Sequence, residues 1–164
     1  MASVFDNLIA NATKHTVLDT SQVKAVKCGH IYNVKVSAAA DNGKIVTIAS
    51  NQYAGRDVFL EQAATSTSVT GRIVDIDDDG KFVVFVDTVG SVGHVAILAQ
   101  DELMYPEISN NPAFFYNAAN DVVRAYELVP GDKFAMTAEG FTGATPAVGK
   151  AVASAASGKL TVSA

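Results

Sequence analysis

The sequence predicts a mainly β fold, either a β-sandwich or a partly open barrel, preceded by a short N-terminal helix or arm. From Val23 onward, short runs of β-branched and aromatic residues recur, as is typical of strands. Turn-forming residues separate these runs at uneven intervals, which favours one sandwich or barrel over a repeat array. Glycine is followed by Lys or Asp in these turns, at Gly43, Gly80, Gly131, Gly149 and Gly158.

Residues 1–20 are predicted to form the arm or short helix, and residues 21–164 a single mainly β domain. Between Ala2 and Lys14 the apolar side chains fall on one side of a helix of about three turns at most. A helix this short is marginal on its own, so it has to pack on its own domain or on a partner. Its apolar residues are Val4, Phe5, Leu8, Ile9 and Ala12.

The clearest local unit is a hairpin with arms 69–76 and 81–87 and the tip Asp77-Asp78-Asp79-Gly80. The composition of residues 41–44 predicts a second hairpin turn, between 34–36 and 45–48. Further strands are expected over 56–60, 92–98, 114–116, 122–128 and 133–138, with a turn at 130–132. The small residues of 151–157 predict a thin edge strand or a flexible arm, and Gly158-Lys159 another turn.

Composition argues against several classes of function. The 164 residues are 49% hydrophobic and 18% charged, and the net charge is −5 with no basic run, so we expect no nucleic-acid partner. The longest apolar runs are far shorter than the roughly 20 residues of a membrane-spanning helix, so we expect no membrane partner. The N-terminus has neither the basic nor the apolar region of a secretory signal. A single cysteine, Cys28, excludes an internal disulfide and fits a reducing compartment.

Candidate chemical sites are weak. Asp75-x-Asp77-x-Asp79-Gly80 matches the first half of a calcium loop, but the twelfth position is Val86 instead of Glu, which favours a solvated hairpin tip. Cys28 and His30 lie two residues apart and could form a nucleophile pair, although a buried, inert cysteine is the more common case. The sequence therefore predicts no catalytic residue, no cofactor and no bound metal, and we expect the protein not to be an enzyme.

Five aromatic residues fall within 22 positions, near two prolines: Tyr105, Phe114, Phe115, Tyr116 and Tyr126. Aromatic rings fill cores, and they also anchor protein interfaces. Both interpretations stay open from the sequence. We predict the partner contacts to come from the N-terminal segment and this aromatic stretch, at Val4, Phe5, Leu8, Ile9, Tyr105, Phe115 and Tyr116.

The C-terminal 40 residues resemble phage head-decoration proteins and other small virion proteins. The resemblance lies in Val129-Pro130-Gly131-Asp132-Lys133-Phe134, Ala138-Glu139-Gly140-Phe141, Val148-Gly149-Lys150 and Gly158-Lys159-Leu160. It implies a mainly β cement protein, made in the host cytoplasm and placed on the capsid surface of the virion. There it would reinforce contacts between major capsid proteins through a terminal arm, as a monomer or a homo-oligomer such as a trimer.

Three other functions remain open from the sequence. A minor virion component, such as a head fibre or tail protein, would have much the same composition. A small β module could bind carbohydrate or another ligand through residues 105–126. An enzyme would have to use Cys28 and His30.

Overall fold

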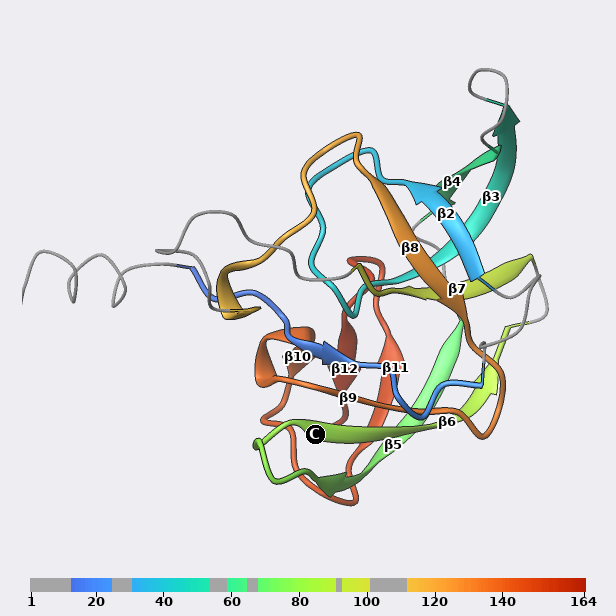
Figure 1. Ribbon diagram of the computed structural model, residues 1–164. Helices are drawn as coiled ribbons and strands as arrows, with labels where there is room; N and C mark the ends of the chain where they lie inside the picture. The colour runs from blue at the N-terminus through green and yellow to red at the C-terminus, as the bar shows by residue number, and fades with distance from the viewer. Residues whose placement is uncertain (1–12, 25–30, 54–58, 65–67, 91–92, 101–111) are drawn as a thin grey trace, which may run out of the picture.

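The computed structural model describes residues 13–24, 31–53, 59–64, 68–90, 93–100 and 112–164. These residues form strands and two single-turn 3-10 helices (Figure 1). In chain order they are β1 (Leu18–Asp19), β2 (Ile31–Lys35), β3 (Ile45–Tyr53), β4 (Phe59–Ala64), β5 (Val69–Ile76), β6 (Phe82–Val89), β7 (His94–Leu98), η2 (Pro112–Phe114), β8 (Val122–Glu127), β9 (Lys133–Met136), η3 (Ala138–Gly140), β10 (Phe141–Gly143), β11 (Ala151–Ser154) and β12 (Leu160–Val162).

The strands form two units, and the predicted mainly β fold is confirmed. One is a seven-stranded sheet in the order β1-β9-β6-β5-β11-β12-β10, called sheet A below. The other is a closed barrel in the order β2-β4-β3-β7-β8. Figure 1 shows the barrel strands in the upper half of the view and sheet A in the lower half. Most neighbouring strands are antiparallel, whereas β2 with β4 and β10 with β12 are parallel.

The predicted hairpin at residues 69–87 is confirmed as β5 and β6, which pair from Val69↔Val89 to Ile76↔Phe82. Its tip is held by Asp77, whose Oδ1 accepts the backbone N–H groups of Asp79 at 3.1 Å and Lys81 at 2.7 Å. Gly80 takes a φ of 80°, which glycine adopts without strain. Asp and Gly therefore have turn-forming roles at this tip.

The small residues of the C-terminal tail form an interior strand, so the predicted edge strand or flexible arm is wrong for 151–154. β11 lies between β5 and β12 in sheet A, and the turn at Gly158 joins it to β12. Opposite Val152 stands Gly71, where a Cβ would come within 2.4 Å of the Phe85 carbonyl oxygen. Ladder pairing uses backbone groups, so small side chains do not decide whether a strand is central.

Two other expectations fail because a local signal does not determine pairing. The turn at 41–44 exists, with Gly43 at a φ of 81°, but it joins β2 to β3, and these strands are separated by β4 in the barrel. The predicted strand at 114–116 is replaced by η2 and two residues without regular structure. Pro112 starts η2, and its carbonyl accepts the N–H of Phe115 at 3.1 Å.

The turn predicted at Pro130–Asp132 is present, and it carries the chain from the barrel into sheet A.

The barrel and sheet A share apolar packing. Successive residues of β7 alternate between two clusters, with Val95 and Ile97 packed against sheet A and Ala96 and Leu98 inside the barrel. All four side chains are buried, which explains why this strand is apolar without a polar alternation. In β3, Ile45 likewise joins the cluster against sheet A, while Val46 and Ile48 point into the barrel.

The segment 13–24 lies against sheet A. β1 pairs with β9 through Leu18↔Met136 and Asp19↔Ala135, and Val23 is buried in the sheet A cluster. The N–H of Lys24 is bound by Oδ1 of the buried Asp132 at 3.1 Å. The helix predicted for Ala2–Lys14 falls almost entirely outside the described residues. Among those described, no helix has the length and apolar character needed to cross a membrane.

Candidate partner-binding surface

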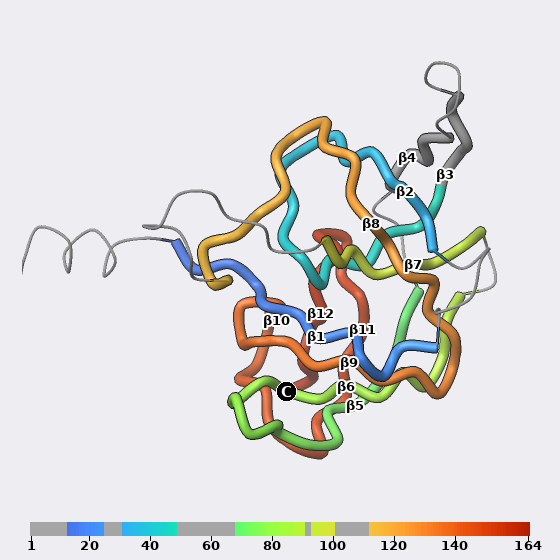
Figure 2. The backbone as a smooth tube through the Cα atoms, viewed as in Figure 1, coloured from blue at the N-terminus to red at the C-terminus, as the bar shows by residue number. Residues whose placement is uncertain are grey.

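The first described residues lie beside the segment that follows η2. The backbone N–H of His15 donates to the carbonyl of Ala113 at 2.7 Å. The His15 ring stacks on Tyr116, with centroids 5.1 Å apart and planes inclined at 29°. Figure 2 shows the start of the described chain in blue next to the gold segment that begins at Pro112. We call the surface formed by His15, Phe115 and Tyr116 the docking face.

The docking face is held in place by the loop between β2 and β3. Asp41 of this loop binds His15, with its Oδ1 2.6 Å from the imidazole Nδ1. Asn117 forms a two-way backbone bridge with Ala40, at 3.0 and 2.9 Å. The buried Asn117 side chain also donates to the Ala40 carbonyl at 3.0 Å and to Asn42 Oδ1 at 3.3 Å. Hydrogen bonds therefore hold the backbone on both sides of Tyr116, at Phe115 and at Asn117.

The predicted partner contacts are placed only in part. Tyr116 is 51% exposed, although it is one of the large apolar side chains, and Phe115 is half-buried. Tyr126 packs against the sheet A cluster, so this member of the aromatic stretch serves the core. The remaining predicted contacts, Val4, Phe5, Leu8, Ile9 and Tyr105, lie outside the described residues, as do Cys28 and His30.

The acidic hairpin tip is neutralised in part by its own lysine. The ammonium of Lys81 lies 3.1 Å from Asp79 Oδ2. Burial lowers the pKa of Lys81, but the hydrogen bond to Asp79 and the charges of Asp79, Asp77 and Asp19 outweigh it, so the pKa is raised above 10.5. In the part of the chain that the structure describes, no three His, Cys, Asp or Glu side chains are grouped to hold a metal ion.

A second polar cluster lies on the barrel. Glu127 accepts a hydrogen bond from the Tyr32 hydroxyl at 2.9 Å and lies 3.1 Å from His94 Nδ1. The Tyr32 and His94 rings are 5.6 Å apart. These contacts link β2, β7 and β8.

Sequence reasoning missed the residues that support the docking face. His15 and Asp41 are 26 positions apart, and Ala40 and Asn117 are 77 apart, so no local spacing connects them. The one usable signal was the polar Asp41-Asn42 pair before Gly43, which was interpreted only as turn chemistry. Comparisons with models of known protein families, with curated proteins and with solved structures find no match to this chain.

Proposed function

We propose that this protein is a non-enzymatic virion structural protein, and specifically a capsid decoration protein that reinforces contacts between major capsid proteins. It would bind the capsid surface through the docking face and the N-terminal segment that precedes it. The observation that carries the proposal is the packing of His15 against the predicted aromatic contact Tyr116. His15 bonds to Ala113 and stacks on the exposed Tyr116, and the predicted contacts Val4, Phe5, Leu8 and Ile9 precede His15 in the sequence.

The physical character of this face supports protein binding. Tyr116 offers a large amphipathic side chain, the type enriched at interface centres. Its backbone neighbours are fixed by hydrogen bonds, which lowers the entropic cost of binding. An arm with an apolar side gains order by docking beside such an anchor. Repetition over a capsid would turn modest single contacts into strong attachment.

Co-sedimentation with empty phage capsids tests the proposal. The protein is expected to pellet with shells stripped of decoration proteins, at a fixed number of copies per shell, beside a known cement protein as positive control. Its mass in free solution tells whether it arrives as a monomer or as a homo-oligomer such as a trimer. If the control pellets and this protein does not, the decoration role is wrong, and a carbohydrate-binding module becomes the hypothesis to test on a glycan panel.

Two variants connect the binding to the docking face. Tyr116→Ser is expected to weaken capsid binding by roughly tenfold or more, as loss of an interface anchor does. Val148→Ser is the matched control, because Val148 is similarly exposed, at 54%, but lies in the turn before β11. Equal binding by both variants would place the contact elsewhere on the molecule.

A further inference from the structure

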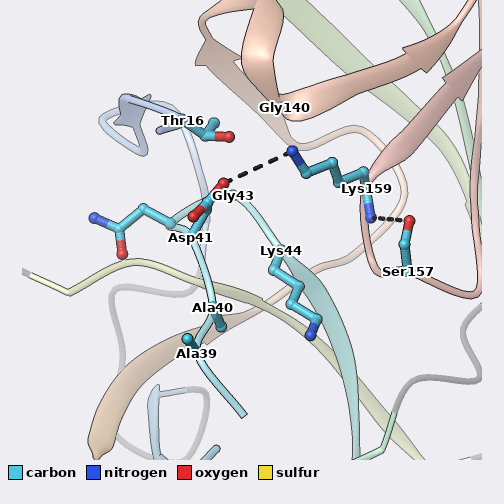
Figure 3. A pocket seen from close by; sticks show the side chains of 10 residues that line it. Thr16, Ala39, Ala40, Asp41, Gly43, Lys44, Gly140, Ser157 and Lys159 are labelled. Atoms are coloured by element: carbon cyan, nitrogen blue, oxygen red, sulfur yellow. Dashed lines mark hydrogen bonds and ion pairs between the residues drawn. The ribbon is translucent and has the colours of Figure 1, made fainter. Parts of the chain in front are cut away.

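A cavity of about 130 Å³ lies where segment 13–24, the β2–β3 loop and sheet A meet (Figure 3). Thr16 lines one wall, residues 39–44 another, and Gly140, Ser157 and Lys159 the side of sheet A. It is open to solvent, since the Asp41 and Lys159 side chains at its edge remain 20% and 38% exposed. The proposed function makes no use of this cavity.

Thr16 is fixed in the wall, and no described residue hydrogen-bonds to its hydroxyl. The residue is 1% exposed. Its methyl group is wedged between two glycines, because a Cβ on Gly43 or Gly140 would come within 3.1 or 3.0 Å of it. Within the described part of the chain the hydroxyl has no hydrogen-bond partner. A buried hydroxyl without a partner is costly, and native proteins normally satisfy such groups.

The neighbouring ion pair is also incomplete. Asp41 Oδ2 and Lys159 Nζ are 3.7 Å apart, which is too long for a direct hydrogen bond. Each has one good partner on its other side: Asp41 Oδ1 lies 2.6 Å from His15 Nδ1, and Lys159 Nζ donates to the Glu139 carbonyl at 2.8 Å. Figure 3 shows Thr16 beside the Asp41–Lys159 gap. The cavity thus offers an acceptor oxygen, an ammonium donor and a hydroxyl together.

We infer that this cavity binds a primary carboxamide group. The amide N–H would donate to Asp41 Oδ2, and its carbonyl would accept from Lys159 and Thr16. An anion would meet the Asp41 carboxylate, and a cation would meet the ammonium of Lys159, with Lys44 close by. A neutral group with both donor and acceptor atoms avoids both repulsions. The amide can come from a small free molecule or from an Asn or Gln side chain of a partner.

The experiment is an amide-resolved NMR titration of the whole protein with acetamide, at constant ionic strength. Acetamide is expected to shift the Gly43, Gly140 and Ser157 resonances saturably, with a Kd of millimolar order, as befits so small a ligand. Acetate and methylammonium are expected to bind more weakly. The inference is wrong if acetamide gives no saturable shift, or if either ion binds as well as acetamide does.

A second arm identifies the source of the amide. N-acetyl-asparagine methylamide is compared with N-acetyl-alanine methylamide, which has the same backbone but no side-chain amide. Saturable binding of the asparagine compound alone supports insertion of a partner's side chain. Binding of acetamide but of neither peptide compound supports a small free amide.

Three variants test the assigned atoms. Thr16→Val keeps the methyl group between Gly43 and Gly140 and removes only the hydroxyl, so acetamide binding should weaken about tenfold. The Tm of the free protein should not fall, because no described residue hydrogen-bonds to the hydroxyl. Lys159→Met should weaken binding at least as much, whereas Lys150→Met, in the similar Gly149-Lys150 turn away from the cavity, should not. Unchanged affinity in both Thr16→Val and Lys159→Met would overturn the inference. This outcome leaves the proposed capsid binding untouched.

Discussion

The two apolar clusters of the molecule are built differently. The cluster between sheet A and the barrel contains large side chains, among them Phe134, Met136 and Phe141. The buried described residues inside the barrel are Val, Ala, Ile and Leu, with Tyr32 only at the margin. A closed five-stranded barrel has a narrow interior, whereas the space under an open sheet can accept rings. The first cluster should therefore be sensitive to lost volume, and the second to added volume.

The largest expected effect is loss of volume under sheet A. Phe134→Ala removes a ring that is 1% exposed and should lower the free energy of unfolding by about 3–5 kcal/mol. Urea denaturation measures it. Phe82→Ala is the matched control, because Phe82 is half-buried and makes an edge contact with Phe141, with ring centroids 5.8 Å apart. Equal losses would contradict the assignment of Phe134 to the centre of the cluster.

The next effect is added volume in the barrel. Ala125 is fully buried on β8, and Ala125→Leu should destabilise the protein by about 1–3 kcal/mol through overpacking. Ala153→Leu introduces the same change on the exposed side of β11 and should alter stability by no more than about 0.5 kcal/mol. Thermal or urea unfolding compares the two. If Ala125→Leu were neutral, the barrel interior would be less tightly packed than described.

A third effect tests the link between segment 13–24 and the turn that enters sheet A. Asp132→Ala removes the acceptor of the Lys24 and Val129 N–H groups, which are bound at 3.1 and 2.8 Å. The free energy of unfolding should be about 1–2 kcal/mol lower than in the wild type, because these two N–H groups lose their acceptor. Asp121→Ala removes only the exposed acceptor of the Ala118 N–H, so it should lower the free energy of unfolding by less than Asp132→Ala does. Hydrogen exchange at Lys24 should rise in Asp132→Ala, and unchanged exchange there would count against the link.

The smallest effect is a pH dependence at the hairpin tip. The pKa of Lys81 is raised in the folded state, so its stabilising effect is complete below the ordinary value near 10.5 and is lost as pH rises through the higher folded value. Lys81→Met should therefore remove a slight fall in stability above pH 10, and Lys150→Met should not. Melting curves from pH 8 to pH 11.5 measure the difference. Identical alkaline profiles for wild type and Lys81→Met would contradict it.

Local elements of the fold could be predicted from the sequence. The β5–β6 hairpin and the Gly158 turn depend on residues that are neighbours in the chain, so period-two patterns and turn residues sufficed. The closure of the barrel could not be predicted, because β2 pairs with β8 across about ninety residues. The central position of β11 could not be predicted either, because its pairing with β5 is long-range and uses backbone groups, which the small side chains of β11 do not reveal.

In the candidate site, too, the local features could be predicted from the sequence and the long-range contacts could not. Tyr116 could be singled out because an aromatic stretch near prolines is a local signal, while its exposure is seen only in the fold. Its partners His15 and Asp41 were not, because a stacked ring and a hydrogen bond between distant segments exist only after folding. Thr16 gave no local signal, since its burial arises only on folding, as does the lack of a described hydrogen-bond partner for its hydroxyl.

Hydrogen–deuterium exchange of the protein free and bound to capsids tests the central claim most directly. The account predicts added protection at residues 13–17 and 113–117, where the His15–Ala113 and Asn117–Ala40 bonds lie. The hairpin tip at 76–81 should exchange as in the free protein. Protection at that tip or along the outer strands of sheet A, with none at 13–17 and 113–117, would contradict the assignment of the docking face.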